Sequence, residues 1–232
     1  MTSWTVGTVA STESETPTGR SIWLDVPGWQ GNLPGQHVDV RLTAPDGYQA
    51  TRSYSIASSG PEPRVQLAVD RLPDGEVSPY LVNDLLPGDM LELRGPLGGW
   101  FVWKDDDVRP VQLIAGGSGV VPLVAMVRAH AASGSTVPMQ LLYSVRSPED
   151  RFFATELESV EGVTFQYTRE APDGWTGALG RVSGELLKAS TLPPPSAVFV
   201  CGPTGFVETV ADLLVELGHD PGTVKTERFG GK

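Results

Sequence analysis

The first hundred residues alternate hydrophobic and polar positions over short runs, which is typical of half-buried strands. Pro-Gly and Asp-Gly turn signals recur between these runs. The clearest strands are Ser21 to Val26, His37 to Thr43, Val65 to Arg71 and Met90 to Gly95. One short helix is expected at Ser78 to Leu86, with Ser78 as its cap and Pro79 in the first helical position. The pattern predicts an all-β domain, an antiparallel six-stranded barrel, over residues 1–104.

The pattern changes after Asp105-Asp106-Asp107, where buried strands begin to alternate with helices. Strands are expected at Val111 to Ala115, Met139 to Tyr143, Thr164 to Thr168 and Ala197 to Val200. Helices are expected at Pro122 to Ala132, Glu149 to Ser159, Arg181 to Ala189 and Gly205 to Leu217. This order predicts an α/β domain with a doubly wound parallel sheet over residues 105–232, whose ligand lies at the carboxyl ends of the strands.

Composition narrows the class of protein. The chain has 232 residues, of which 40% are hydrophobic. Its net charge of -11 weighs against a protein that binds nucleic acids or anionic membranes in general. The single cysteine, Cys201, excludes an internal disulfide and a four-cysteine cluster held by this chain alone. Because no leader pattern or apolar run of about 20 residues is present, we expect a cytoplasmic protein that does not enter membranes.

No metal site is expected. The three histidines, His37, His130 and His219, fall in a strand, a helix and a loop, without ligand spacing. The acidic run at 105–107 is interpreted as a solvated linker between the two domains.

A glycine turn, Gly117-Ser118-Gly119, follows the strand at 111–115 and opens a helix. Backbone N–H groups and the helix dipole can face a phosphate there, and Pro122 costs no hydrogen bond in the first turn. The segment departs from the usual dinucleotide fingerprint, which has a small residue where Pro122 stands. A tight turn without a ligand is the alternative.

Hydroxyl and guanidinium groups follow the second strand of this domain. A site for NAD would place an acidic residue there, whereas this chain has Ser144, Arg146 and Ser147, with Arg151 further on. These groups favour a 2′-phosphate and hence NADPH over NADH. Solvated surface charges are an equal alternative for Arg146 and Arg151.

Cys201-Gly202-Pro203 ends a buried strand and places a small polarizable side chain over the central crevice. The alternative is that Cys201 only packs in the core.

In the first domain, Arg52-Ser53-Tyr54-Ser55 combines a positive charge, an aromatic face and a hydroxyl on one strand, which suits a flavin that carries phosphates. The alternative is an ordinary barrel strand with Tyr54 in the core.

Five motifs occur in a fixed order along the chain: Arg52-Ser53-Tyr54-Ser55, Gly75-Glu76-Val77-Ser78, Gly116 to Pro122, Cys201 to Thr204 and Glu227 to Gly230. In this order they resemble the ferredoxin-NADP(+) reductase superfamily. The branch they resemble most is that of the bacterial oxygenase reductases and flavohaemoglobin reductases, reduced to the FAD and NAD(P) domains. The resemblance covers the chain from about Thr5 onward.

In the barrel, the resemblance implies that Arg52 pairs with the FAD pyrophosphate, Tyr54 stacks along the flavin and ribityl region, and Ser55 hydrogen-bonds near flavin N5. The residues implied to line the isoalloxazine edge are Val69, Asp70 and Arg71. The turn implied to contact the diphosphate is Gly75, Glu76, Val77 and Ser78.

In the second domain, the resemblance implies that Ser118 and Cys201 flank the nicotinamide and that Thr168-Arg169 contacts the nucleotide. Phe229 resembles the aromatic residue that covers the flavin, and Glu227 the acid near the nicotinamide. Plant-type members end instead in a stacked tyrosine, and Gly230-Gly231-Lys232 is compatible with the start of a linker.

The function implied is an FAD-dependent NAD(P)H oxidoreductase, with Ser55, Cys201 and Glu227 in catalytic roles. NADPH is the expected electron donor, and NADH is also possible. The expected acceptor is a separate ferredoxin or oxygenase component. The reductase itself is expected to be a monomer. Two alternatives stay open. One is a flavin reductase or direct reductase of an oxygenase or haem protein, and the other is a non-catalytic electron-transfer subunit of a larger complex.

Overall fold

The structure, a computed structural model, describes residues 3–229 and divides into two compact units. The first unit is the chain up to Lys104 together with Val124–Ala132. The second unit is Asp105–Leu123 together with the chain from Ser133 onward.

The first unit contains a six-stranded antiparallel sheet, as the alternation predicts. Its strands are β1 (Thr5–Thr16), β2 (Gly19–Asp25), β3 (His37–Thr43), β4 (Gln49–Ser55), β5 (Arg64–Asp70) and β6 (Met90–Leu97). The strand order is β4-β3-β6-β1-β2-β5. An antiparallel bridge between Ile56 and Leu67 brings the end of β4 onto β5, so the two outer strands meet and the sheet curls into a barrel.

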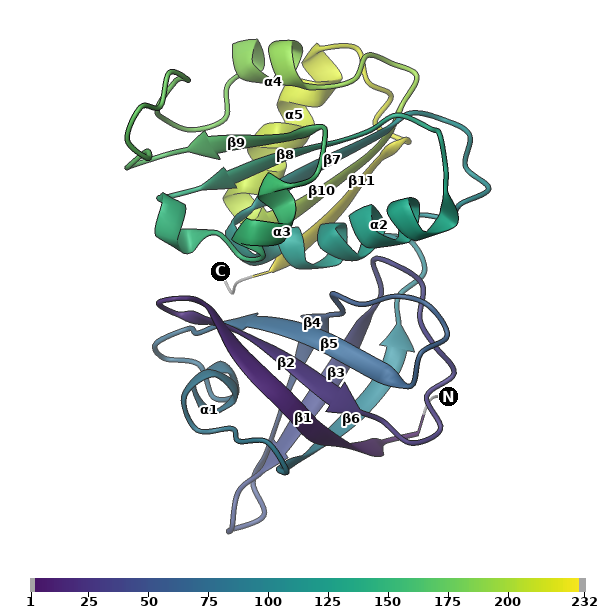
Figure 1. The fold of residues 1–232 in the computed structure, drawn as a ribbon, viewed down its shortest axis with the longest axis vertical. Coiled ribbons are helices and arrows are strands. Elements are labelled where there is room, and N and C mark those ends of the chain that lie inside the picture. The colour runs from purple at the N-terminus through teal and green to yellow at the C-terminus, as the bar shows by residue number, and fades with distance from the viewer. Residues whose placement is uncertain (1–2, 230–232) are drawn as a thin grey trace. The chain divides into compact units, whose positions relative to one another are not determined.

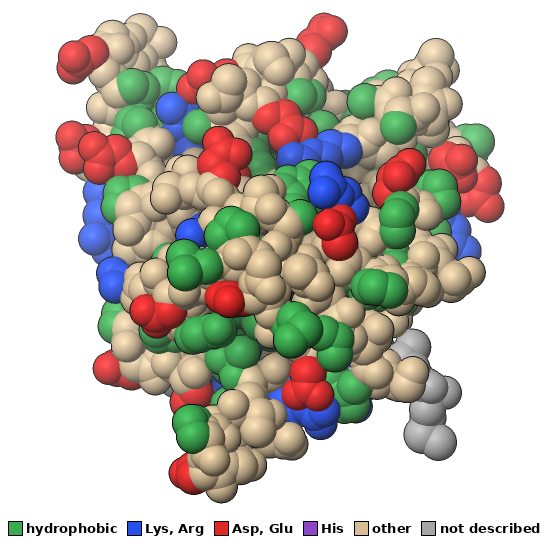
Figure 2. All heavy atoms as spheres, turned by 60° about the horizontal axis from the view of Figure 1, so that its bottom comes forward, with side chains coloured by type: hydrophobic (Ala, Val, Ile, Leu, Met, Phe, Trp, Pro, Cys, Tyr) green, Lys and Arg blue, Asp and Glu red, His purple; other side chains and the backbone are tan. Residues whose placement is uncertain are grey.

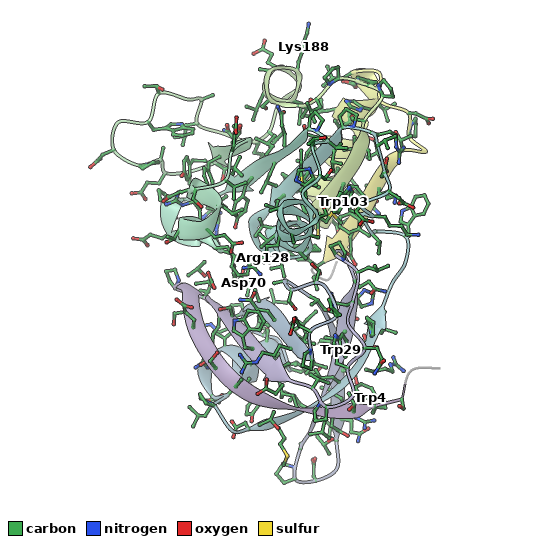
Figure 3. All side chains as sticks on the ribbon, turned by 45° about the vertical axis from the view of Figure 1, so that its right-hand side comes forward. Trp4, Trp29, Asp70, Trp103, Arg128 and Lys188 are labelled. Atoms are coloured by element: carbon green, nitrogen blue, oxygen red, sulfur yellow. The ribbon has the colours of Figure 1, made fainter. Side chains whose placement is uncertain are left out.

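Alternate residues of these strands fill the barrel. Val38, Val40, Ile22, Leu24 and Leu67 are all fully buried in one hydrophobic cluster. Burying each such side chain stabilises the fold by about 1.5–3 kcal/mol, before the loss of chain entropy. Trp29 joins this cluster, whereas Trp4 stacks under the guanidinium of Arg41, whose Cζ lies 4.2 Å from the ring centre (Figure 3).

Helix α1 (Ser78–Asn83) is shorter than expected, and its cap is different. The residue at the cap position is Val77, which makes no side-chain capping hydrogen bond. Ser78 Oγ instead accepts a hydrogen bond of 3.0 Å from the backbone N–H of Leu72. The prediction of Ser78 as cap is therefore wrong, because its hydroxyl closes the preceding turn back onto the end of β5.

The second unit contains a parallel sheet with the order β11-β10-β7-β8-β9. Its strands are β7 (Val111–Gly116), β8 (Met139–Val145), β9 (Val163–Tyr167), β10 (Ala197–Pro203) and β11 (Val224–Phe229). The doubly wound parallel sheet is confirmed, but the expected count of four strands is wrong. Strand β11 was missed because it is a partly exposed edge strand without a continuous apolar run.

The helices that alternate with these strands along the chain are α2 (Val120–Ser133), α3 (Ala154–Glu158), α4 (Gly184–Ser190) and α5 (Thr204–Glu216), with short 3-10 turns at Gly117–Gly119 and Pro148–Asp150. Residues 124–132 of α2 are grouped with the first unit. Helices α4 and α5 cover one face of the sheet, where Leu187 and Val207 pack on Ile114 and Val198 (Figure 1).

The expected helix at 149–159 is interrupted. Phe153 has a left-handed φ of 55°, which separates the turn at Pro148–Asp150 from α3. Phe152 and Phe153 are both buried, and the backbone N–H of Phe152 donates to Tyr143 Oη at 3.1 Å. Burial of two consecutive aromatic side chains therefore overrides helix continuity at this point.

Figure 2 shows acidic side chains spread over the face that it presents, interspersed with basic and hydrophobic groups. Across residues 3–229, none of the helices combines the length and the apolar character that crossing a membrane requires.

Candidate functional site

Two predicted flavin-site segments meet in the barrel. Arg52 on β4 forms an ion pair through Nη2 with the carboxylate of Glu76, in the turn before α1. Its Nη1 donates to the backbone carbonyl of Thr51 at 2.8 Å. Arg52 is about half exposed, with 51% of its side-chain surface accessible. The cation is therefore positioned by protein groups and still open to solvent.

Neighbours of Arg52 on β4 point in alternating directions. Tyr54 packs against the hydrophobic cluster of the barrel, and burial raises the pKa of its hydroxyl. Ser53 points the other way, and its Oγ donates to Asp39 Oδ1 at 2.7 Å. Asp39 also accepts from Arg94 Nη2 at 2.5 Å, and hydrogen bonds from these two partners keep its pKa below the usual range despite burial. The hydroxyl of Ser53 is thus engaged within the protein.

The remaining barrel residues divide between the surface and the core. Ser55 ends β4 opposite His37 on β3 and is partly exposed. Val69 and Val77 have side chains buried in the hydrophobic cluster, so only their backbones remain for a ligand. Asp70 at the end of β5 accepts a hydrogen bond of 2.8 Å from Thr18 Oγ1.

Arg71 provides a test of whether the barrel fits a diphosphate. Its Nε is buried and has no hydrogen-bond partner among the described residues. The next residue, Leu72, is bonded to Ser78, so Arg71 adjoins the same turn that holds Glu76. Buried donors are nearly always satisfied in native proteins, and guanidinium groups match phosphate oxygens in geometry. An orphaned Arg71 donor and a half-exposed Arg52 therefore fit the diphosphate of FAD.

The glycine turn of the second unit needs glycine at two positions for two different physical reasons. Gly117 has a φ of 55°, and a side chain there would meet nothing within 4 Å. Gly119 has the opposite problem, because a Cβ would lie 2.3 Å from the backbone carbonyl oxygen of Cys201. Gly119 is thus explained by close packing of the turn on β10, while Gly117 leaves the space beside Ser118 open.

A pocket of about 550 Å³ opens in the second unit. It brings together three predicted site residues from three strand ends, Ser144, Thr168 and Pro203. Its other lining residues are Arg181, Val182, Gly205, Phe206, Thr209 and Val210. Hydroxyls, one guanidinium and an aromatic ring at the carboxyl edge of a parallel sheet suit the ribose, phosphate and base of a nucleotide.

The predicted arginines are not among the residues that line this pocket. Arg146 Nη2 lies 2.5 Å from Asp150 Oδ1, and Arg151 Nη1 lies 2.6 Å from Glu158 Oε1. The backbone N–H of Arg169 donates to Arg146 O at 2.9 Å. The arginine that lines the pocket is Arg181, which the sequence pattern places at the start of a helix and does not mark as a site residue.

Cys201 and Glu227 face each other across the parallel strands β10 and β11. Burial, and secondarily the charge of Glu227, raise the pKa of the Cys201 thiol well above its usual range. Burial raises the pKa of Glu227 to about 7. The raised pKa favours the neutral thiol over the thiolate.

Phe229 pairs with Pro203 at the ends of β11 and β10, and 37% of its surface is exposed. Gly202 lies one residue earlier, opposite Arg228. Gly230, Gly231 and Lys232 lie outside the described residues.

Within residues 3–229, no group of three or more His, Cys, Asp or Glu side chains is arranged to hold a metal ion.

Two family models match the chain in the order of its two units. The oxidoreductase FAD-binding domain matches residues 13–102, and the oxidoreductase NAD-binding domain matches residues 113–212. NADH-cytochrome b5 reductase 1 of Pyricularia oryzae is 31% identical over 214 residues, covering 85% of this chain and 68% of that protein. The chain belongs to the FAD- and NAD-binding oxidoreductases of the ferredoxin-NADP(+) reductase superfamily. The expected resemblance and the pairing of FAD with a nicotinamide nucleotide are thereby confirmed.

Other members of this superfamily are also similar. The glycine betaine monooxygenase reductase subunit of Chromohalobacter salexigens is 33% identical over 210 residues, which cover 85% of this chain and 56% of that protein. The chain thus spans little more than half of that relative. Among solved structures, the FAD/NAD-binding domain of a nitric oxide dioxygenase from Vibrio cholerae superposes with a TM-score of 0.86 at 27% identity, covering 98% and 99% of the two chains.

Proposed function

We propose that this protein is a reductase that takes a hydride from a nicotinamide nucleotide onto bound FAD and delivers electrons to a separate protein acceptor. The observation that carries the proposal is that one chain pairs an FAD-binding barrel with an NAD-binding sheet. When bound, FAD supplies the capacity to accept a hydride and to release its electrons one at a time.

The barrel residues would bind and orient the cofactor. Arg52 and Arg71 would donate charged hydrogen bonds to the diphosphate. The half-exposed side chain of Arg52 and the buried Nε of Arg71, which has no partner among the described residues, support these roles. The ring of Tyr54 would flank the flavin, and Ser55 at the strand end would donate toward N5. Gly75, Glu76, Val77 and Ser78 would form the wall of the diphosphate site.

The sheet residues would bind the donor and align its nicotinamide. The pocket at the strand ends supports a site for the adenosine half, with Ser144, Thr168 and Arg181 as donors to ribose and phosphate. Ser118 and the neutral Cys201 thiol would flank the nicotinamide, while Glu227 and Phe229 sit on the neighbouring strand. Alignment of two reacting rings accounts for several kcal/mol of a typical barrier, so positioning is the main service of these residues.

The proposed donor is NADPH, because the pocket offers Arg181 and hydroxyls and its described lining contains no carboxylate to hold a ribose 2′-hydroxyl. The proposed acceptor is a ferredoxin or an oxygenase component. Relatives named as a monooxygenase reductase subunit and a dioxygenase electron transfer component support that class. A monomeric state and a cytoplasmic location belong to the same proposal.

The test is to purify the protein, release its cofactor with acid and identify it by chromatography, then follow anaerobic flavin bleaching by NADPH or NADH. FAD and rapid bleaching are expected, followed by reduction of an added ferredoxin. FMN in place of FAD would contradict the cofactor assignment. Release of free reduced flavin would favour a flavin reductase, and bleaching by neither nucleotide would favour a non-catalytic subunit.

A further inference from the structure

The proposed diphosphate ligand Arg52 is already engaged by an acidic side chain. Glu76 accepts from Arg52 Nη2 through Oε2 and from Tyr48 Oη through Oε1, the latter at 2.6 Å. The three residues come from β4, the turn before α1 and the β3–β4 hairpin loop, so the cluster joins three separate segments of the barrel.

Glu76 carries a full negative charge at neutral pH. The Tyr48 hydroxyl is the main cause that holds its pKa below the usual range, and the Arg52 guanidinium adds to that effect. A diphosphate that approaches Arg52 brings further negative charge to the same donors. The carboxylate and the diphosphate therefore compete for one guanidinium.

We propose that Glu76 gates the cofactor's phosphate site, holding Arg52 in the flavin-free protein and yielding it when FAD enters. The inference rests on the proposed role of Arg52. Glu76 keeps Arg52 extended toward the turn in advance, which reduces the ordering needed on binding, but its charge lowers the affinity for FAD. A variant with a neutral side chain at this position is expected to bind FAD more tightly than the wild-type protein.

The same barrel contains a matched control. Arg41 on β3 and Glu92 on β6 form a comparable ion pair at 2.7 Å, and both residues line the same pocket as Glu76 and Tyr48. Glu76→Gln keeps the size of the side chain and one oxygen that can accept from Tyr48. It removes the charge and replaces the oxygen that accepts from Arg52 with an amide NH2 group. Glu92→Gln removes the same charge from the barrel without touching Arg52.

The experiment measures the dissociation constants of FAD and riboflavin by fluorescence titration of flavin-stripped protein, for wild type, Glu76→Gln, Glu92→Gln and Arg52→Ala. The expected result is that Glu76→Gln tightens FAD binding roughly twofold to fivefold, the range for a partly exposed charge. Riboflavin, which has no phosphate, is expected to bind both proteins equally. Glu92→Gln is expected to match wild type with both ligands.

Three outcomes would overturn the gate. They are unchanged or weaker FAD binding in Glu76→Gln, an equal gain for riboflavin, and an equal gain in Glu92→Gln. Failure of the proposed function looks different, because FAD would then bind wild type no better than riboflavin, or Arg52→Ala would bind FAD as tightly as wild type. Circular dichroism of each stripped protein shows that the comparisons use folded chains.

Discussion

The two nucleotide regions of this protein offer phosphates different kinds of partner. In the barrel, Arg52 is paired with Glu76, so a phosphate that binds Arg52 as proposed would compete with a carboxylate. In the sheet, the described residues that line the pocket are hydroxyls, apolar groups and Arg181, without an acid among them.

A second difference, in the number of proposed guanidinium donors, matches the expected lifetimes of the two ligands: Arg52 and Arg71 in the barrel against Arg181 in the sheet pocket. A ligand held by charged, forked hydrogen bonds leaves slowly, because such bonds are about twice as strong as neutral ones. A pocket of hydroxyls with one cation releases its ligand more readily. The barrel is thus suited to a resident cofactor, and the sheet to a nucleotide that enters and leaves in each cycle.

The largest expected effect is on cofactor retention. Arg52→Ala is expected to weaken FAD binding by about 2 kcal/mol or more, roughly thirtyfold, because a charged hydrogen-bond donor is lost. Arg52→Lys should recover part of this loss through charge alone. Equilibrium dialysis measures both variants. If the alanine variant binds FAD as tightly as wild type does, Arg52 does not hold the diphosphate, and the proposed difference between the two regions fails for the barrel.

The next effect concerns the choice of donor. Arg181→Ala is expected to raise the KM for NADPH about tenfold more than the KM for NADH, since one charged hydrogen bond to a 2′-phosphate disappears. Arg146→Ala serves as the comparison, because its guanidinium is held by Asp150. Steady-state kinetics at one ionic strength gives both ratios. A selective loss in Arg146→Ala with no change in Arg181→Ala would restore the assignment that sequence alone favours.

A smaller effect is expected where the two rings are aligned. Ser55→Ala and Cys201→Ala should each slow hydride transfer roughly fivefold, as expected for losing a neutral contact. Stopped-flow bleaching of the flavin measures the rate, and thermal unfolding checks the fold. Wild-type rates in both variants would assign these side chains to packing.

The smallest effect is a dependence of stability on pH. Burial raises the pKa of Glu227 to about 7 in the folded chain, so the fold favours its neutral form. Its contribution to stability is therefore complete below its unfolded pKa, near 4.3, and is lost as the pH rises through 7. Between pH 5 and pH 8, the free energy of unfolding of Glu227→Gln should rise by about 1 kcal/mol relative to that of wild type. This is less than the full pKa shift would give, because solvent relaxation around the charged carboxylate reduces the effect. Urea unfolding across this range measures it, and a constant difference would contradict the assignment.

The fold was largely readable from sequence because its periodicities are local. Strand β3 begins and ends where the alternation predicts, at His37 and Thr43. Strand β11 was not readable in the same way, because an edge strand is identified by the partner it pairs with. The role of Ser78 could not be predicted for the same reason. Its hydroxyl accepts a hydrogen bond from the backbone N–H of Leu72 across a turn whose conformation the sequence pattern does not specify.

The candidate site shows the same limit more sharply. The order of motifs predicts the segments that hold Arg52 and Cys201, and the hydroxyl and guanidinium groups after the second strand of the sheet domain predict Ser144. Which arginine lines the pocket depends on ion pairs such as Arg146 with Asp150, and these form only when the chain folds. The pairing of Arg52 with Glu76, 24 residues apart, is likewise a product of tertiary structure.

Strand β11 has a practical consequence for attaching reporters to this protein. It runs parallel to β10 and reaches Phe229 beside Pro203, which itself lines the pocket. A fluorophore attached at the end of β11 would therefore lie close to where the nucleotide is proposed to dock. Such a label is suited to a biosensor of nucleotide occupancy, whereas a label on an exposed loop of the barrel leaves this end of the sheet unaltered.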